Sequence, residues 1–329
     1  MSFVEFDSFH KEEHPCSTVF LSANKYIRKM KGGSQSILVQ CDDNRFYVVK
    51  MLGNPQGPNV LANELLGSII ADAVGLPVAE GRLIHISHHF IDSEPDMWFE
   101  LPYGRKRPEA GLHFGSLLVG QPFGPQRPSE YISRSRIKTI TNRDAFLGMY
   151  ILDVWANHQD NRQAVLLRRS DDDTQEVFFI DHGHMFGGSE WSFKERSGVA
   201  LHLESSVYSG LWQDEIVSSW ISHFRTALPE VLCWVSSIVP SQWYNGDLRS
   251  LFEGLIHRLS NLTELVQMDA TKSRQFVHQN SENDTLRLSD SGIHKIRAPD
   301  TRSTVYRDLA TTYARVTHSD RLCSAKLAE

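Results

Sequence analysis

The chain has 329 residues, of which 40% are hydrophobic and 22% charged, so it can bury a sizeable core and form two packed lobes with room for a tail. Its formal net charge of −6 does not indicate a nucleic-acid-binding surface. No apolar run reaches about 18 residues, and the first residues lack the basic and apolar parts of a signal peptide. We therefore expect a cytoplasmic protein that by itself binds neither nucleic acid nor membrane. The four cysteines are far apart, which predicts reduced thiols and no zinc site.

Residues 17–50 predict β-structure. Runs rich in β-branched and aromatic residues at 36–41 and 46–50 are separated by a polar turn. A glycine-containing turn precedes the first of these runs, and glycines there let backbone N–H groups approach phosphate oxygens. A Gly-Gly hairpin is also common in proteins that bind no ligand, so the turn alone does not establish a phosphate site. The residues of this candidate phosphate loop are Gly32, Gly33, Ser34, Gln35 and Ser36.

Lys50 ends an otherwise apolar strand pattern, a position where a lysine is commonly an edge residue that reaches water. Further along, Glu64 lies in a predicted helix over 59–75, with Asn59 as its cap and Gly75 as its end. Protein kinases present a phosphate-binding lysine and its orienting glutamate in this same order, after a glycine-rich turn. The order of the elements favours a kinase more than any single element does.

The middle of the chain predicts a connection between two lobes. Residues 81–86 alternate as a strand, and the irregular stretch 92–126 is rich in proline and glycine. Within it, 111–120 has the pattern of a strand that leaves one lobe for the next. In a kinase, a segment of this kind offers backbone groups to adenine, although the residue types here do not prove it.

The second predicted lobe opens with a helix that leads to Asp160. Thr141 and Asp144 fit a capping box for this helix, and Asp160 lies in the polar turn after it. Asp181 comes directly after a short apolar strand, and Gly183 permits a sharp turn. Phosphoryl transfer needs two carboxylates, one to orient or deprotonate the attacking hydroxyl and one to hold Mg²⁺ against the nucleotide phosphates. A helix, a turn and a hairpin with solvated acids explain the same stretch without any function.

The remaining pattern completes the predicted fold class, α+β. A mostly helical second lobe is predicted by helical patterns at 212–227, 229–239 and 248–266. The polar composition after residue 268 predicts a poorly ordered tail, apart from a short helix at 305–316. The expected domains are a β-rich N-lobe with the Glu64 helix at 1–120, a helical C-lobe at 121–267 and the tail at 268–329.

Taken in order, these motifs resemble the HipA-like kinases, bacterial proteins of the two-lobed protein-kinase-like fold. The likeness spans about residues 25–260, and its quoted motifs include Asn63-Glu64-Leu65-Leu66, Asp160-Asn161-Arg162-Gln163-Ala164 and Ile180-Asp181-His182-Gly183. The resemblance implies an ATP-dependent phosphotransferase that uses Mg²⁺ and typically acts on a serine or threonine hydroxyl of a protein. In some relatives the kinase belongs to a toxin–antitoxin pair, so an antitoxin-like partner is also implied.

The resemblance assigns a role to each candidate residue. Lys50 would contact the α- and β-phosphates, and Glu64 would pair with it. Asp160 would be the catalytic carboxylate, Asp181 the Mg²⁺ ligand, and residues 32–36 the phosphate loop.

The chain also departs from the kinase pattern. Gln159 stands where ordinary kinases have an arginine, so an activation-loop phosphate would lack its usual partner. Val165 stands where a kinase has its second metal-binding asparagine, and Asn161 or Gln163 would have to supply that oxygen. Asp153, on the preceding helix, is expected to be solvated or bonded to a helix cap. A kinase of a small molecule and a non-catalytic pseudokinase that binds nucleotide therefore remain open as alternatives.

Overall fold

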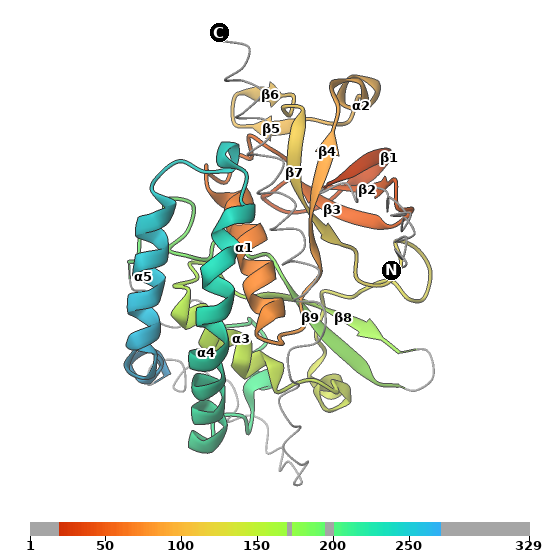
Figure 1. Cartoon of the computed structure of the whole chain (residues 1–329). Coiled ribbons are helices and arrows are strands. Elements are labelled where there is room, and N and C mark those ends of the chain that lie inside the picture. Colours follow the sequence, from red (N-terminus) through yellow and green to blue (C-terminus); the bar gives the residue numbers. More distant parts are fainter. Residues whose placement is uncertain (1–19, 170–172, 195–200, 271–329) are drawn as a thin grey trace, which may run out of the picture.

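Five strands of the N-terminal part close into a barrel, and the helices gather beside it in the α+β chain shown in Figure 1. The computed structural model describes residues 20–169, 173–194 and 201–270. The predicted tail lies outside the described residues from position 271 onward, and so does its predicted short helix. No helix in the described ranges is long and apolar enough to cross a membrane.

The barrel confirms the strands expected around Lys50. Its strand order is β1-β2-β3-β7-β4, and all neighbours pair antiparallel except β1 with β4, which are parallel. The closure into a barrel was not predicted. The bounds of its strands are Leu21–Lys29 (β1), Ile37–Cys41 (β2), Phe46–Lys50 (β3), Gly81–Ile86 (β4) and Gly111–Leu117 (β7).

A short helix runs into the start of the stretch expected to be irregular, 92–126, and a hairpin lies within it. Helix α2 (His88–Ser93) begins where the Ser87 side chain accepts a hydrogen bond from the Phe90 N–H. A short hairpin of β5 (Phe99–Leu101) and β6 (Gly104–Lys106) comes after it. Phe90 and Phe99 are buried in the barrel core, so burial of a few apolar side chains orders this insertion.

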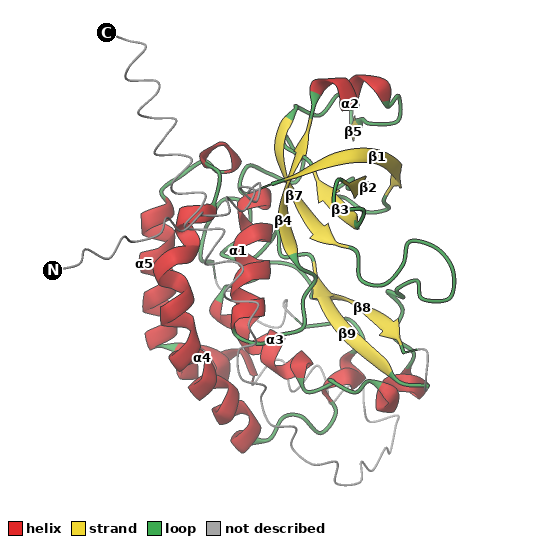
Figure 2. Cartoon of the chain, turned by 45° about the vertical axis from the view of Figure 1, so that its right-hand side comes forward, coloured by secondary structure: helices red, strands yellow, loops and turns green. Residues whose placement is uncertain are grey.

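The second part of the molecule, which we call the helical body, holds the larger core. It contains the hairpin of β8 (Gln163–Arg168) and β9 (Gln175–Ile180), in which Gln163 pairs with Ile180. Figure 2 shows α4 beside α1 and the β8–β9 hairpin below the barrel. The helices of the body are α1 (Val60–Ala73), α3 (Ala145–Trp155), α4 (Asp214–Val235) and α5 (Leu248–Ser260), with short 3₁₀ turns η1 (Arg134–Thr139), η2 (Ser205–Tyr208), η3 (Ser236–Ile238) and η4 (Ser241–Trp243).

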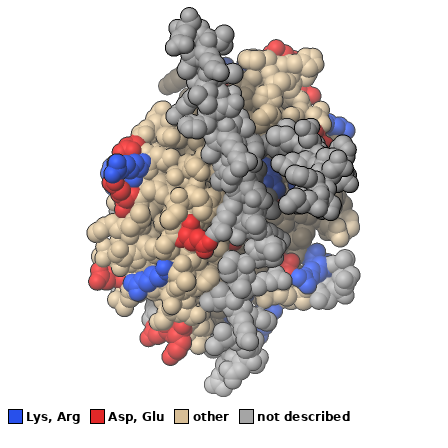
Figure 3. Space-filling view, in the orientation of Figure 1, with Lys and Arg blue, Asp and Glu red and all other residues tan. Residues whose placement is uncertain are grey.

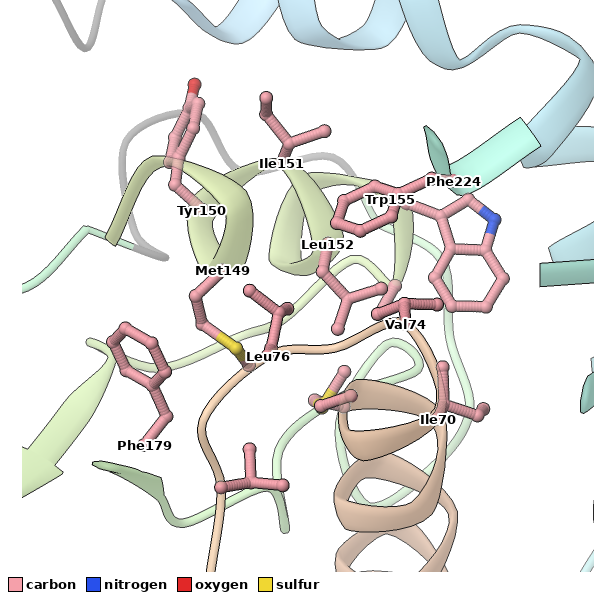
Figure 4. Close-up of a cluster of buried hydrophobic side chains, with 14 of the residues drawn as sticks. Ile70, Val74, Leu76, Met149, Tyr150, Ile151, Leu152, Trp155, Phe179 and Phe224 are labelled. Carbon is pink, nitrogen blue, oxygen red and sulfur yellow. The ribbon is translucent and has the colours of Figure 1, made fainter. Parts of the chain in front are cut away.

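Helix α1 belongs to the helical body by packing, although it lies between two barrel strands in the sequence. Every residue from Val60 to Ala71 is buried. Figure 4 shows Ile70 of α1 and Val74, the residue after α1, on the side of the α3 side chains Leu152 and Trp155, and all four lie in the larger core. Because α1 is covered on all sides, its position is fixed by both parts of the molecule.

Three local predictions are wrong. Pro229 does not begin a new helix but lies inside α4, because the buried stripe of α4 continues on both sides of it and outweighs the lost backbone hydrogen bond. Thr141 does not cap α3, since its hydroxyl donates to the Gln175 carbonyl; the helix begins after Asp144, without a side-chain cap. Asn59 precedes α1 as expected, but its side chain accepts from the Asn245 N–H instead of capping the helix.

The surface shown in Figure 3 carries charges of both signs, dispersed among uncharged residues. Several of the exposed charged side chains form pairs, such as Arg249 with Glu253 on α5, whose atoms Nε and Oε1 are 2.9 Å apart. Exposed pairs of this kind contribute little to stability.

Candidate functional site

Three charged side chains from distant parts of the sequence meet where the barrel joins the helical body. The Lys50 Nζ donates to Glu64 Oε1 in a short hydrogen bond, and it lies 2.8 Å from Asp181 Oδ1. Lys50 comes from the end of β3, Glu64 from α1 and Asp181 from the residue after β9. The ion pair that the sequence predicts between Lys50 and Glu64 is present, and Asp181 joins it.

The backbone after β9 is shaped to bring Asp181 to this cluster. Asp181 itself has φ +63°, in the left-handed region that few non-glycine residues adopt. The next N–H, of His182, donates to Glu64 Oε2 over 3.1 Å. A Cβ on Gly183 would lie 2.9 Å from Val60 Cγ1 and 3.0 Å from Glu64 Oε1. Gly183 is therefore needed for close approach, and it lies in a turn as predicted, in which the Met185 N–H donates to the His182 carbonyl over 3.0 Å.

Lys50, Glu64 and Asp181 shift one another's pKa values. Burial would lower the pKa of Lys50, but the carboxylates of Glu64 and Asp181 outweigh it and raise that pKa to about 12. Burial would raise the pKa of Asp181, but the Lys50 ammonium outweighs it and lowers that pKa to about 2. Glu64 is fully buried, and burial raises its pKa against the pull of Lys50. Lys50 and Asp181 are therefore charged at neutral pH.

The turn that carries Asp160 runs beside the segment after Asp181. Backbone hydrogen bonds link Gln159 N to the His184 carbonyl over 2.9 Å and the Phe186 N–H to the Ala156 carbonyl over 2.7 Å. Asp160 is exposed, and its Oδ1 accepts the Asn161 N–H at 2.8 Å. The fold thus places the two predicted carboxylates on adjacent loops.

Arg162 joins these two loops, a role that the sequence did not reveal. Its Nη1 donates to the carbonyls of Ile180 and Asp181, both over 2.9 Å, and its Nε lies 2.8 Å from Asp153 Oδ2. Asp153 is fully buried, so the expectation that it is solvated or cap-bonded is wrong. An acid within the apolar stripe of α3 was the available signal, because a buried charge needs a partner.

The two candidates for the missing metal-binding asparagine have different partners. The Gln163 amide Nε2 lies 3.0 Å from Asp181 Oδ2. The Asn161 amide Nδ2 is directed to the Leu201 carbonyl at 3.4 Å. Gln163 is therefore the one that the fold brings to Asp181.

Gln159, at the position of the kinase arginine, is engaged with the backbone. Its Nε2 donates to the carbonyls of Asn157 and Lys194, both over 3.1 Å. The position therefore supports the loop and presents no cation to a phosphate.

The glycine turn between β1 and β2 is anchored to other parts of the barrel side. The hydroxyls of Ser34 and Ser36 lie 3.0 Å apart, and Asn54 Nδ2 donates to the Ser34 carbonyl over 3.1 Å. Gln35 has φ +48°, and its amide makes two hydrogen bonds to the Glu100 backbone on β5. The side chain of Gln35 thus fixes the turn to the β5–β6 hairpin.

Two turn residues lack side chains, which leaves backbone exposed at this place. Gly32 has φ +117°, a conformation that favours glycine, and a Cβ there would meet no atom within 4 Å. Both Gly32 and Gly33 are exposed. The turn has the open backbone that a phosphate loop requires.

The donor set around Asp181 suits a hard cation. Among residues 20–169, 173–194 and 201–270, no three His, Cys, Asp or Glu side chains are grouped so as to hold a metal ion. Asp181 offers a carboxylate, and Gln163, whose Nε2 faces Asp181 Oδ2, would offer its amide oxygen after rotation of the amide. Mg²⁺ accepts both kinds of ligand while substrate phosphates and water supply the others. The residues present therefore fit a nucleotide-bound Mg²⁺ and not a cage made of protein side chains alone.

Comparison with known proteins gives one family and several distant structures. The sequence model of a family described as HipA-like kinase matches residues 24–270. No curated protein matches the chain. The Golgi casein kinase with Mn/ADP bound is similar at a TM-score of 0.45 and 14% identity, over 76% of this chain and 74% of that chain. The Helicobacter pylori proinflammatory kinase CtkA is similar at a TM-score of 0.41 and 11% identity, over 73% and 94% of the two chains.

Proposed function

Because the chain belongs to the HipA-like kinase family, we propose that it transfers the γ-phosphate of ATP to a serine or threonine hydroxyl of a protein. The observation that carries this proposal is the cluster of Lys50, Glu64 and Asp181, in which a buried lysine is held charged between two carboxylates. In this proposal the barrel together with α1, within residues 1–120, is the N-lobe of a two-lobed kinase, and the rest of the helical body is the C-lobe.

Each residue of the site has a part in the proposed reaction. Lys50 holds the α- and β-phosphates, and Glu64 keeps the lysine extended toward them. Asp160, exposed on its turn, accepts the proton of the attacking hydroxyl or orients that hydroxyl. The glycine turn at residues 32–36 covers the phosphates with backbone N–H groups.

Asp181 and Gln163 would hold Mg²⁺ in this proposal. The carboxylate of Asp181 is ionised, and Gln163 Nε2 lies 3.0 Å from its Oδ2, so rotation of this amide brings the Gln163 oxygen beside Asp181. When bound, the cation neutralises negative charge on the nucleotide phosphates. Asn161 is the weaker candidate because its amide is turned to Leu201.

Labelled ATP tests the proposed function. Purified protein is incubated with γ-labelled ATP and Mg²⁺, wild type beside Asp181→Ala, and both label on protein and release of ADP are followed. We expect turnover in the wild type, with or without an added protein acceptor, and its loss in Asp181→Ala. Binding of Mg·ATP without turnover to any protein or small hydroxyl acceptor would favour the pseudokinase alternative, and absence of binding would overturn the kinase proposal.

The identity of the acceptor can be approached with the same assay. Transfer to protein in a mixture of cytoplasmic proteins would support the protein-kinase form of the proposal. Transfer only to small hydroxyl compounds would favour the small-molecule kinase. An antitoxin-like partner, as in some members of the family, would be recognised by co-purification with the full chain.

A further inference from the structure

One buried amide on α1 holds the segment after Asp181. Asn63, next to Glu64, is fully buried. Its Nδ2 lies within hydrogen-bond distance of three carbonyl oxygens, of Gly183 at 2.9 Å, Met185 at 3.0 Å and Gly188 at 3.1 Å. Its Oδ1 accepts the indole N–H of Trp191 at 2.7 Å. A single side chain thus binds both ends of residues 183–191, which we call the post-metal segment.

A glycine of α1, Gly67, also lies close to this part of the chain. A Cβ on Gly67, one turn beyond Asn63, would lie 2.6 Å from His182 Cβ and 2.7 Å from Met185 Sδ. The ring of Trp191 packs against that of Tyr244, with centroids 5.6 Å apart. The post-metal segment is therefore enclosed between α1 and the C-terminal part of the helical body.

Asp181 is held by Arg162 at its own carbonyl and by α1 through the residues immediately C-terminal to it. Asp181 stands in the left-handed region, outside the β9 ladder, so the ladder does not fix its carboxylate. The next two residues are fixed by neighbouring side chains of α1, Glu64 at the His182 N–H and Asn63 at the Gly183 carbonyl. Glu64 also binds Lys50, so α1 aligns the lysine and the metal-binding carboxylate with each other.

We propose that Asn63 is a positioning residue of the phosphotransfer site, which keeps Asp181 aligned for the metal-bound nucleotide by holding the post-metal segment against α1. This inference rests on the proposed function. Asn63 does not touch the reacting groups in this role. Its effect is on the affinity for metal-bound nucleotide, and it acts through the backbone on both sides of residue 185.

A purely structural role for Asn63 makes a different prediction. A buried amide that only stabilises the fold would, when removed, lower the melting temperature and leave the folded fraction with normal affinity for Mg·ATP. A positioning role changes the metal-dependent part of nucleotide binding in protein that remains folded. The measurement must therefore separate binding of Mg·ATP from binding of metal-free ATP.

The chain offers a matched control for this measurement. Asn142 also uses its carboxamide on backbone groups, donating to the Val177 carbonyl at 3.0 Å and accepting the Val177 N–H at 2.9 Å. Val177 lies on β9, the strand that leads to Asp181, but it pairs away from the post-metal segment. Asn142→Ala removes the same kind of side-chain-to-backbone hydrogen bond from the strand that leads to Asp181, without releasing residues 183–191.

The experiment measures dissociation constants of Mg·ATP, and of ATP in EDTA, by titration calorimetry on the full chain. Groups that hydrogen-bond a metal ligand directly contribute about 10–100-fold to metal affinity, and Asn63 acts on Asp181 only through the backbone, so we expect Asn63→Ala to weaken Mg·ATP binding by about tenfold, the lower end of that range. Binding of metal-free ATP should stay within about twofold, which is a small free-energy difference. Asn142→Ala should leave both constants unchanged.

Trp191→Phe keeps the proposal testable if Asn63→Ala does not fold. It retains an aromatic ring beside Tyr244, although a smaller one, and removes the N–H donor to Asn63 Oδ1. We expect a smaller loss of Mg·ATP affinity, again without loss of metal-free binding. Unchanged Mg·ATP binding in Trp191→Phe, when Asn63→Ala cannot be purified, overturns the proposal.

The remaining outcomes separate this inference from the proposed function. Wild-type binding of Mg·ATP together with an unaffected, folded Asn63→Ala variant overturns the inference alone. Equal losses in Asn63→Ala and Asn142→Ala also overturn it, because they indicate general destabilisation. A wild-type protein that binds no Mg·ATP overturns the proposed function and this inference with it.

Discussion

The barrel and the helical body contribute unequally to the candidate site. Lys50 and the glycine turn come from the barrel, whereas Glu64, Asp160 and Asp181 lie on elements that pack in the larger core of the helical body. Helix α1 is the reason for the imbalance, because it comes after a barrel strand in the sequence and yet packs against α3 and α4. The ion pair of Lys50 with Glu64 is therefore a contact between the two parts. Nucleotide binding and metal-dependent chemistry should be separable by substitutions on either side of it.

The largest effects on transfer and on nucleotide binding are expected from two substitutions, one in the helical body and one in the barrel. Asp160→Asn, in the helical body, should lower the rate of phosphoryl transfer by about 10²–10⁴-fold and leave nucleotide binding intact, since it removes only the proton acceptor. Lys50→Met, in the barrel, should abolish or sharply weaken the thermal stabilisation that Mg·ATP gives. Single-turnover transfer and melting curves over a range of Mg·ATP concentrations measure the two effects.

Two outcomes would contradict the roles assigned here to the helical body and the barrel. If Asp160→Asn turns over at the wild-type rate, Asp160 is not the base and the chemistry does not reside on that turn. If Lys50→Met retains the wild-type shift in melting temperature at every Mg·ATP concentration, the barrel does not supply the phosphate-binding cation. Either result would remove one residue from the proposed site and reduce what that part of the molecule contributes to it.

The next effect concerns the stability of the helical body. Removing one partner of a buried ion pair typically costs about 3–5 kcal/mol, so Arg162→Leu should lower the free energy of unfolding by about that amount. The variant leaves Asp153 charged and buried and also frees the carbonyls of Ile180 and Asp181. Urea unfolding of each variant gives the free energy.

Two further variants test whether burial of the charge is the cause. Arg249→Leu removes an arginine from the exposed pair on α5 and should change stability by only about 0.5 kcal/mol. Asp153→Leu combined with Arg162→Leu removes both buried charges and should recover part of the loss. A single Arg162→Leu variant as stable as Arg249→Leu would contradict the view that this pair anchors the body's half of the site.

The same division explains how much could be predicted from the sequence. Strand and helix patterns near Lys50 and Glu64 are local, and their bounds and their ion pair were predicted. The closure of the barrel and the packing of α1 into the helical body depend on contacts between distant segments, which a local pattern does not contain.

The details of the site could be predicted only in part, for a related reason. Asp160 and Asp181 were recognisable because each comes after a regular element in a polar turn. Arg162 and Asn63 act through backbone carbonyls of another segment, and nothing in their own sequence neighbourhood identifies those partners. Gln35 was predicted as part of the phosphate loop, and the use of its side chain on Glu100 depends on the β5–β6 hairpin, which was not predicted.

The smallest expected effect is on the pH dependence of stability, and it concerns one buried histidine in the barrel and one in the helical body. His113, on barrel strand β7, has a buried Nε2 without a hydrogen-bond partner among the described residues, and burial, with a smaller effect of His85, lowers its pKa to about 3. The Nδ1 of His158, in the helical body, is also buried without a hydrogen-bond partner among the described residues. Burial, with a smaller effect of the Arg162 charge, lowers the pKa of His158 well below its usual value. Both rings are therefore neutral in the folded protein at neutral pH.

The sign of the pH dependence is set by the unfolded state. An unfolded histidine takes up a proton as the pH falls below about 6.5, whereas these folded ones do not, so the free energy of unfolding decreases as the pH falls. Each ring lowers the free energy of unfolding by up to about 1.4 kcal/mol for each pH unit below about 6.5. His113→Gln and His158→Gln should each reduce this slope, measured by urea unfolding between about pH 7.5 and 5.5, above the range in which exposed carboxylates titrate. A slope that falls only in His158→Gln would show that the barrel does not unfold together with the helical body, because a single cooperative transition must register the protons of both histidines.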